Sequence, residues 1–326
     1  MSEYVALLKQ LDFHYLYPVS KRWFLFLPAV ICPLSFLYDA PFGRFATPSS
    51  LLAVDGITSW IFMELISPLA FGVTLWLHPF SPHAIPLPSL SRPQITPQLL
   101  LTSLFFVHYL NRALISPLRT PSRSKSHLSV VLSAIVFNTV NGFLLSAYLS
   151  SARLGAILVN AYSSPRFWLG IALWAAGFAG NIAHDEMLLN LRRKAKAKGK
   201  AREAAGQSAG EHYAIPHGGL YRLVSYPNYL CEWIEWAGFA LAAGPAPDWQ
   251  LLPAVAPVLT ALTSGALGEV GQLFTPFADS VMPPWAFFFG EVFLMIPRAV
   301  RGHQWYHQRF GTSYPSERRA IIPWLL

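Results

Sequence analysis

Residues 128–149 read LSVVLSAIVFNTVNGFLLSAYL, and none of them is Asp, Glu, Lys or Arg. A helix that crosses the hydrocarbon core of a bilayer, about 30 Å thick, needs roughly 20 consecutive apolar residues. The stretch has that length and that composition, so it predicts a transmembrane helix. The same signal recurs on both sides of it along the chain.

Other apolar stretches of similar character lie at 23–40, 57–78, 98–117, 166–190, 229–243 and 284–300. Together they predict an all-α fold, a polytopic membrane helix bundle of about seven transmembrane helices, formed by residues 1–326 as a single domain. A further apolar stretch, 249–267, is interrupted by Pro253 and Pro257, which favours a re-entrant or surface hairpin. The polar or proline-rich segments 79–97 and 192–215 are interpreted as loops.

The composition indicates a protein whose outer surface faces lipid. Hydrophobic residues make up 53% of the chain and charged residues only 12%, whereas a soluble domain usually carries about 25% charged residues. The mean hydropathy is +0.38, and the 11 tryptophans suit rings at membrane interfaces. The two cysteines, Cys32 and Cys231, both lie in apolar stretches and indicate no disulfide framework.

The net charge of +8 is concentrated in three regions: four Lys and Arg residues lie within 112–125, seven within 192–202 and five within 298–319. In a chain this apolar, basic loops indicate membrane orientation rather than nucleic-acid binding. Seven helices with the N-terminus outside would place all three regions in the cytosol, although Lys9, Lys21 and Arg22 favour the reverse. The run 194–202 has no apolar face, so we interpret 192–212 as a basic cytosolic loop.

Ionisable side chains within the predicted helices are candidates for a functional site, because a charge in the hydrocarbon core is costly. Glu64 lies in the span 57–78 with no basic residue within a turn of it. It could line a site, lie near a helix end or pair with a distant arginine. Tyr109 and Arg112 close the span 98–117, three residues apart and on one helix face. They could also form part of an interface belt.

A denser polar set ends the span 166–190. Asn181, Asp185 and Arg192 fall within about 40° of one helix face, at about 100° per residue. They place an amide, a carboxylate and a guanidinium at the mouth of one helix. This pattern predicts either a ligand site or a network of caps and salt bridges.

The next predicted helix carries its own polar face. Pro227 suits its first turn, after which Asn228 and Glu232 stack at i, i+4 and Glu235 follows three residues later. Two carboxylates that enter an apolar helix need partners. A cofactor that presents amides and hydroxyls would supply them.

Arg298, His303, Tyr306 and His307 follow the last span. The two histidines have the spacing of a metal-binding pair, but the sequence holds no second box of this kind, so we expect no metal. Arg298 and Tyr306 are interpreted as phosphate and ring contacts. No G-x-G-x-x-G after a strand and no Walker loop occurs, so a dinucleotide would bind without a Rossmann fold, its phosphates held by the basic ends of helices.

Three motifs carry a family resemblance: Ile215-Pro-His-Gly-Gly-Leu-Tyr221, Val224-Ser-Tyr-Pro-Asn-Tyr-Leu-Cys-Glu-Trp-Ile-Glu-Trp236 and Tyr314-Pro-Ser-Glu-Arg-Arg-Ala-Ile-Ile-Pro323. With further matches at 108–112 and 138–142, the chain from about residue 57 to 326 resembles the steroid 5α-reductase family of membrane reductases. That resemblance implies a seven-helix bundle in the endoplasmic reticulum membrane. It implies NADPH as cofactor and reduction of a carbon–carbon double bond conjugated to a carbonyl in a lipid, such as a Δ4-3-ketosteroid.

The resemblance also implies roles for individual residues. It places Glu64 and Tyr109 at the substrate carbonyl, where Tyr109 would donate to the developing negative charge and Glu64, kept protonated by burial, would share that role. The positions that match cofactor contacts are Arg112, Asn181, Asp185, Arg192, Tyr213, Asn228, Glu232, Arg298, His303 and Tyr306.

The chain departs from the family pattern at Met63, Asn111, Leu189 and Ala214, and the segment 244–283 resembles an atypical insertion. An enoyl-CoA or polyprenol reductase of the same superfamily remains an alternative, as does a membrane methyltransferase that uses S-adenosylmethionine. A transporter would show inverted repeats, and the sequence shows none. The expected partners are an apolar enone substrate and the lipid bilayer, with neither nucleic acid nor an obligate protein partner.

Overall fold

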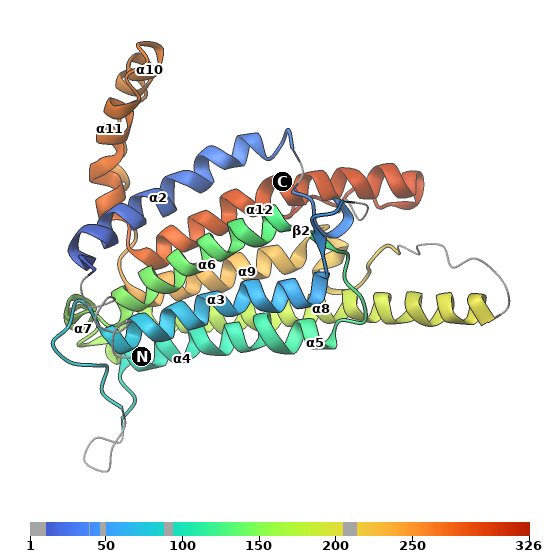
Figure 1. The fold of residues 1–326 in the computed structure, drawn as a ribbon, viewed down its shortest axis with the longest axis horizontal. Helices are drawn as coiled ribbons and strands as arrows, with labels where there is room; N and C mark the ends of the chain where they lie inside the picture. Colours follow the sequence, from blue (N-terminus) through green and yellow to red (C-terminus); the bar gives the residue numbers. More distant parts are fainter. Residues whose placement is uncertain (1–10, 39, 46–49, 88–93, 205–213) are drawn as a thin grey trace.

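The computed structural model describes residues 11–38, 40–45, 50–87, 94–204 and 214–326, and these are mostly helical. The main helices run side by side and form one bundle (Figure 1). They are α2 (Phe13–Leu34), α3 (Gly56–Leu77), α4 (Pro97–Tyr109), α6 (Leu128–Leu149), α8 (Pro165–Ala204), α9 (Pro227–Ala243) and α12 (Pro283–Phe310).

Short elements join these helices. The helical ones are η1 (Gly43–Phe45), η2 (Leu110–Ile115), α5 (Ser116–Arg119), α7 (Ala152–Ile157), η3 (Ala161–Ser163), η4 (Gly219–Arg222), η5 (Trp249–Leu251), α10 (Val255–Thr263), α11 (Leu267–Ser280) and η6 (Gly311–Ser313). Strand β1 (Ala53–Val54) pairs antiparallel with β2 (Ser126–His127), Ala53 opposite His127. This small ribbon ties the entry of α3 to the entry of α6.

Three segments of the described chain are long and apolar enough to cross a membrane, namely 56–77, 97–119 and 128–149. They are α3, the continuous run α4–η2–α5, and α6, and each coincides with a stretch that the sequence predicted. The other main helices form where apolar stretches were expected, although α2 begins at Phe13 and ends at Leu34 rather than spanning 23–40. Seven membrane crossings stay a prediction.

The predicted loop from residue 192 is wrong in its first part, because α8 continues without a break to Ala204. Ala, Lys, Arg and Glu dominate this stretch and all favour helix. A helix that projects beyond the bundle needs no apolar face, and its described basic side chains make polar contacts, such as Lys196 Nζ to the Pro121 carbonyl at 2.9 Å. The remainder of the expected loop, 205–212, lies outside the described residues.

Local sequence signals begin several helices. The Asp55 side chain accepts the backbone N–H of Ile57 and Thr58 at the start of α3. Thr96 caps α4 in the same way. Pro227 occupies the first turn of α9, where its missing N–H costs nothing.

Two glycines allow the close helix contacts on which the interior depends. A Cβ on Gly177 of α8 would lie 2.3 Å from the backbone nitrogen of Glu235 on α9. A Cβ on Gly142 of α6 would lie 2.3 Å from the carbonyl oxygen of Ser67 on α3. Because only glycine leaves room for these backbones, α8 packs directly on α9 and α3 on α6.

Aromatic side chains fill the centre of the bundle. The rings of Phe71 and Phe105 stack with centroids 4.2 Å apart, and Trp236 meets Phe287 edge-on at 4.6 Å. All four are buried. The His108 ring lies 4.6 Å from Trp236, so a polar cluster begins directly beside this apolar centre.

The C-terminal tail packs against the segment that precedes α9. The Ser225 N–H donates to the Arg319 carbonyl at 2.8 Å, and the Tyr226 N–H donates to the Ala320 carbonyl at 3.0 Å. The second and third of the sequence motifs quoted above are therefore neighbours in space, which the sequence order alone does not reveal.

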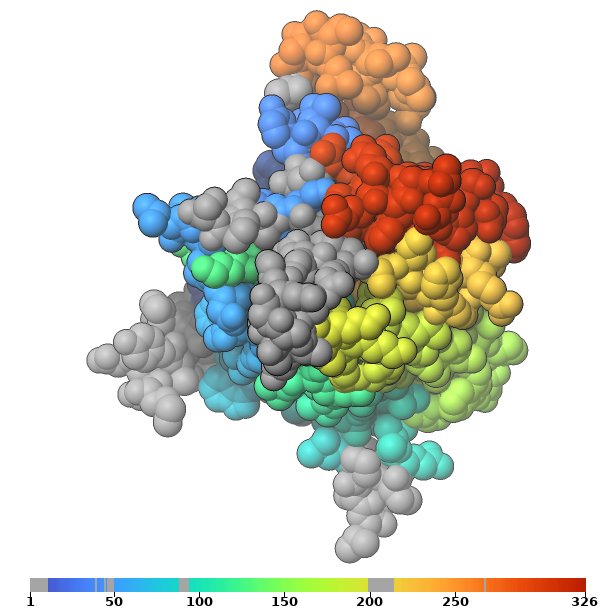
Figure 2. Space-filling view, turned by 90° about the vertical axis from the view of Figure 1, so that its right-hand side faces the viewer, coloured from blue at the N-terminus to red at the C-terminus, as the bar shows by residue number. Residues whose placement is uncertain are grey.

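Residues 249–280 form an arm outside the bundle, made of η5, α10 and α11. Figure 1 shows the arm leaving the bundle at the end where α12 begins, and Figure 2, turned by 90°, shows it projecting beyond the body. Its base is anchored, since the Trp249 ring packs on Phe277 at 5.5 Å and Arg22 pairs with Asp279 at 2.9 Å. The hairpin expected at 249–267 is thus a projecting helix pair, longer than predicted.

Candidate active site

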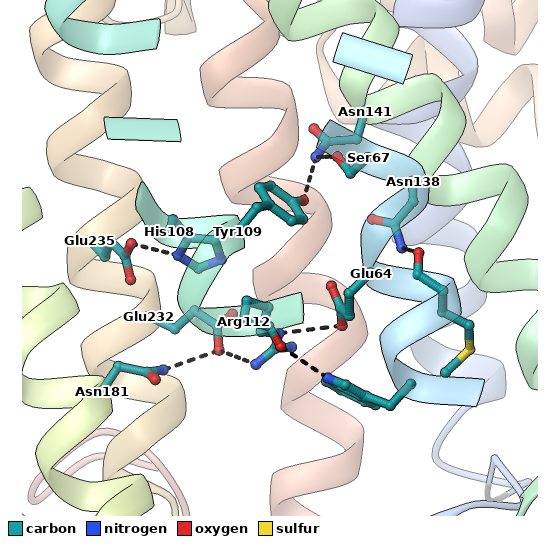
Figure 3. A network of polar contacts seen from close by, with 12 residues as sticks. Glu64, Ser67, His108, Tyr109, Arg112, Asn138, Asn141, Asn181, Glu232 and Glu235 are labelled. Atoms are coloured by element: carbon teal, nitrogen blue, oxygen red, sulfur yellow. Dashed lines mark hydrogen bonds and ion pairs between the residues drawn. The ribbon is translucent and has the colours of Figure 1, made fainter. Parts of the chain in front are cut away.

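Arg112 links three helices at the centre of a polar network (Figure 3). It lies in η2, a π-helical turn between α4 and α5. Its Nε donates to Glu64 Oε1 on α3 at 3.3 Å, and its Nη1 donates to Glu232 Oε2 on α9 at 3.4 Å. One guanidinium therefore faces two carboxylates inside the bundle. Removing one of these three groups would leave a buried charge without its partner.

The partner of Glu64 is the distant arginine that the sequence left open as one alternative. The two residues are 48 positions apart, so no local pattern could have paired them. The expectation that Glu64 is a protonated hydrogen-bond donor to a substrate carbonyl stays a prediction.

The polar faces of α8 and α9 meet as the sequence predicted. The Asn181 side chain donates to Glu232 Oε2 at 3.3 Å and to the Asn228 carbonyl at 3.1 Å. The Asn228 side chain in turn donates to Asp185 Oδ1 at 3.1 Å. A row of amides and carboxylates thus leads from Glu232 along α9 and α8 to Asp185.

Tyr109 faces a different wall. Its oxygen accepts a hydrogen bond from Asn141 Nδ2 on α6 at 3.0 Å, and the same nitrogen lies 3.2 Å from Ser67 Oγ (Figure 3). Tyr109 is only 4% exposed, and its ring packs on Phe105. The Tyr109 hydroxyl is thus held by Asn141 of α6 and lies beside Ser67 of α3.

His108 and Glu235 form a pair that sequence reasoning missed. His108 Nδ1 lies 2.6 Å from Glu235 Oε1, and both side chains are buried. The second carboxylate oxygen of Glu235 has no partner among the described residues. Each of the two residues is polar within an apolar stretch, which could have marked it as a candidate. Because 127 positions separate them in the sequence, no local pattern could have paired them.

Basic side chains gather at the mouth of this network. The Arg123 guanidinium lies 3.5 Å above the Trp60 ring, and Arg112 lies 4.8 Å from the same ring. Burial lowers the pKa of Arg123 to about 9, and repulsion from Arg112 and Arg192 contributes further. Three mutually repelling cations favour an anionic ligand, and Arg123 was not among the residues predicted from sequence.

Tyr306 of α12 belongs to the same region. Burial, followed by the neighbouring Tyr306 and Asp185, raises the pKa of Tyr221 in η4, and Arg192 opposes this. The four groups therefore lie close enough to interact. The Tyr306 ring also stacks on Tyr314, with centroids 5.1 Å apart, which joins the C-terminal tail to this mouth.

Two further predicted residues have partners outside the Arg112 network. Arg298 Nε donates to the Tyr229 hydroxyl at 3.2 Å, and its guanidinium lies 3.5 Å from the Phe42 ring centroid. His303 Nδ1 lies 2.6 Å from Ser225 Oγ. The described contacts of both residues are structural ones, and their cofactor role rests on the resemblance.

Tyr213 lies outside the described residues, so its predicted cofactor contact has no structural counterpart here. Among the residues that are described, no group of three or more His, Cys, Asp or Glu side chains is arranged to hold a metal ion. The pair His303 and His307, with ring centroids 4.6 Å apart, has no third such ligand beside it within that part of the chain.

The donor set fits a phosphorylated dinucleotide such as NADPH. Arg112, Arg123 and Arg192 supply positive charge for phosphate oxygens at the mouth. Deeper in, Asn181 and Glu232 offer an amide and a carboxylate to a carboxamide, and Glu235 has one buried oxygen without a partner among the described residues.

Comparison with known proteins finds relatives that match most of the chain. The family model described as 3-oxo-5-alpha-steroid 4-dehydrogenase matches residues 124–262 and 267–326. An uncharacterised protein of Schizosaccharomyces pombe, C9.08c, is 36% identical over 91% of this chain and 94% of its own length. The bovine protein named 3-oxo-5-alpha-steroid 4-dehydrogenase 1 is 30% identical over 89% of each chain. The tomato protein named steroid 5-alpha-reductase DET2 is 30% identical over 88% of each chain.

Proposed function

Because this chain belongs to the 3-oxo-5-alpha-steroid 4-dehydrogenase family, a family of oxidoreductases, we propose that it reduces an apolar enone with NADPH. The proposed substrate class is the Δ4-3-ketosteroids, and the proposed location is the endoplasmic reticulum membrane. The observation that carries the proposal is the gathering of polar side chains from α3, α4, η2, α8 and α9 inside the bundle. Tyr109 and Glu64 lie in this cluster, and Arg123 and Arg192 lie near Arg112 at its edge.

NADPH, when bound, supplies a hydride for the carbon β to the substrate carbonyl. Arg112, Arg123 and Arg192 would bind its phosphates, and the row formed by Asn181, Asp185, Asn228 and Glu232 would bind its amide and hydroxyl groups. Tyr213, Arg298, His303 and Tyr306 complete the proposed cofactor contacts. The apolar spans around this row exclude water, which strengthens each polar contact.

Tyr109 is the proposed hydrogen-bond donor to the carbonyl oxygen. Negative charge grows on that oxygen as the double bond is reduced, so a donor already in place lowers the barrier. Asn141 Nδ2 donates a hydrogen bond to the phenol oxygen of Tyr109 at 3.0 Å, and packing on Phe105 fixes the ring. Glu64 fixes Arg112 beside this position, and the pair keeps the charge at the site balanced.

The proposal is tested with purified protein in lipid nanodiscs, NADPH and testosterone as a Δ4-3-ketosteroid. We expect NADPH oxidation matched one to one by formation of the 5α-reduced 3-ketone. Arg192→Ala should raise KM for NADPH well above its effect on KM for the steroid. Tight binding of S-adenosylmethionine in place of NADPH would contradict the proposed reaction. Reduction of an enoyl-CoA or a polyprenol in place of testosterone would contradict the proposed substrate class.

A further inference from the structure

Glu291 of α12 is a fourth acidic side chain directed at the Arg112 network. Its charge interacts with those of Glu232 and Glu235 on α9, Arg112 in η2 and Glu64 on α3. Tyr109 on α4 also interacts with it. Phe287 and Met295, one turn before and one turn after Glu291, are both buried, and the Phe287 ring lies 4.6 Å from Trp236 of α9, so Glu291 lies on the face of α12 that points into the bundle. The sequence analysis did not single it out.

The acids around Arg112 differ in whether they have partners. Glu64 and Glu232 share Arg112, Glu235 pairs with His108, and Asp185 accepts from Asn228. Glu291 makes no hydrogen bond or ion pair with the described part of the chain. It is therefore the acid whose carboxyl group is left available for a ligand.

The exposure of Glu291 also indicates a carboxyl group that is available for a ligand. Glu232 and Glu235 are 3% and 0% exposed, whereas Glu291 is only half-buried. Because Glu291 lies between buried residues on the inward face of α12, its exposed part faces the inside of the bundle. An apolar interior disfavours a carboxylate that lacks a cation or donor, so the neutral acid is the form suited to this position.

We propose that Glu291 is the catalytic acid that protonates the carbon α to the substrate carbonyl. The inference rests on the proposed function, because only enone reduction requires that proton. Tyr109 is occupied at the carbonyl oxygen and Glu64 is paired with Arg112. Phe287 contacts Trp236 and Arg298 contacts Tyr229, so Glu291 lies between these two contacts of α12 with α9, beside the turn of α9 that carries Glu232, which is assigned to the cofactor. The α carbon, one bond from the carbonyl carbon, must lie in the same region.

The step balances in electrons and atoms. A hydride adds to the β carbon with its electron pair, and the former double-bond pair moves to form an enolate whose charge lies on oxygen. The enolate pair then takes the proton of the Glu291 carboxyl group at the α carbon. The saturated ketone leaves together with the oxidised cofactor, and the Glu291 carboxylate regains a proton from water.

The first test compares Glu291→Gln and Glu291→Asp with wild type in NADPH-dependent reduction of testosterone. A lost general acid typically costs about 10²–10⁴-fold in rate, so Glu291→Gln should lower kcat by at least about 100-fold. Its solvent deuterium isotope effect on kcat should rise, because protonation becomes slower than hydride transfer. Glu291→Asp, which keeps the acid, should recover part of the rate. Glu269→Gln, an exposed glutamate of the arm, is the matched control and should behave as wild type.

The second test needs no cofactor. By microscopic reversibility, the group that protonates the α carbon also removes an α proton from the saturated ketone. We expect wild type and Glu269→Gln to exchange one α hydrogen of 5α-dihydrotestosterone for deuterium in D₂O, as measured by mass spectrometry. Glu291→Gln should lose this exchange while its NADPH affinity and thermal unfolding midpoint stay unchanged.

The outcomes separate the two proposals. Wild type that reduces testosterone, with Glu291→Gln equal to it in kcat, isotope effect and exchange, overturns the role of Glu291 alone. A rise in KM for the steroid with no change in these three quantities also overturns it, because Glu291 would then only bind substrate. Wild type that oxidises no NADPH with any enone overturns the proposed function, and the role of Glu291 with it.

Discussion

Tyr109 and Arg112 are three residues apart but contact different helices around the site. Regular helical geometry predicts a shared face, yet Tyr109 contacts Asn141 on α6 while Arg112 contacts α3 and α9. The π-helical turn that begins at Leu110 changes the rotation per residue between them. Such turns are frequent at functional sites and leave no reliable mark in the sequence.

Tyr109→Phe removes the proposed donor and keeps the ring. We expect kcat for enone reduction to fall by about 10²–10³, the usual cost of losing one donor to a developing oxyanion. NADPH affinity should stay the same, because Tyr109 is not among the proposed cofactor contacts. Single-turnover NADPH oxidation, with cofactor titration on the same preparation, measures both quantities.

The chain offers a matched control for this substitution. Tyr148 is also buried, and its hydroxyl donates to the Ala243 carbonyl at 2.9 Å, outside the Arg112 network. Tyr148→Phe should lower thermal stability without changing kcat. Wild-type turnover in Tyr109→Phe, or equal loss in both variants, would end the role proposed for Tyr109.

At this scale, the sequence predicted those residues whose pattern lies within one helix. Asn181 and Asp185, and Asn228 and Glu232, were identified because each pair recurs at i, i+4, and the structure brings the two pairs together. The pair of His108 and Glu235 was missed, because its two members lie on different helices, 127 positions apart in the chain. Pairing across helices depends on how they pack, which a single sequence does not contain.

Among the helices, α6 and α8 show what a sequence pattern can and cannot predict. Helix α6 spans Leu128–Leu149, the apolar stretch as predicted, because both ends of the stretch are marked by composition. Helix α8 exceeds its predicted end by more than three turns. The apolar pattern stops where α8 leaves the bundle, but its helical propensity continues, so a boundary based on hydrophobicity was set too early.

The arm gives a prediction at the scale of elements. In α10 only Ala261 is buried, whereas Phe277 in the base of α11 belongs to the hydrophobic core. Replacing 254–271 with a short Gly/Ser linker should therefore leave kcat, KM and thermal stability unchanged. Phe277→Ala should destabilise the protein by about 3 kcal/mol or more, as core phenylalanines usually do. Thermal unfolding and steady-state kinetics of both variants provide the comparison.

The same experiment can contradict this view of the arm. A well-folded linker variant with a raised KM for the steroid and an unchanged KM for NADPH would show that the arm shapes the substrate entrance. The sequence pattern had marked all of 244–283 as one insertion. The buried side chains of Phe277, Ala278 and Val281 show that its last part supports the bundle.

Across the whole molecule, positive charge is concentrated at one end. The basic regions 112–125, 192–202 and 298–319 belong to α5 and its neighbours, the outer half of α8 and the end of α12 with the tail. Figure 1 shows these elements at the same end of the bundle, with α7 and the base of the arm at the other. The folding of the chain thus collects charge that the sequence distributes over three distant segments.

This distribution predicts how the protein sits in the membrane. Basic segments next to membrane helices are retained on the cytosolic side. The end with α5 and the C-terminal tail should therefore face the cytosol, where NADPH would reach the arginine mouth.

The test starts from a variant without native cysteines, Cys32→Ser with Cys231→Ala. One new cysteine is then added at a time, either Ser316→Cys in the tail or Asn160→Cys beyond α7, and both positions are exposed. In intact microsomes a membrane-impermeant maleimide should label the cysteine at 316 and not the one at 160. Detergent should make both reactive. Labelling of 160 alone before detergent would reverse the orientation and leave the proposed cofactor site on the wrong side for cytosolic NADPH. Labelling of both in sealed vesicles would show that the two ends share one side, which is incompatible with an odd number of crossings between them.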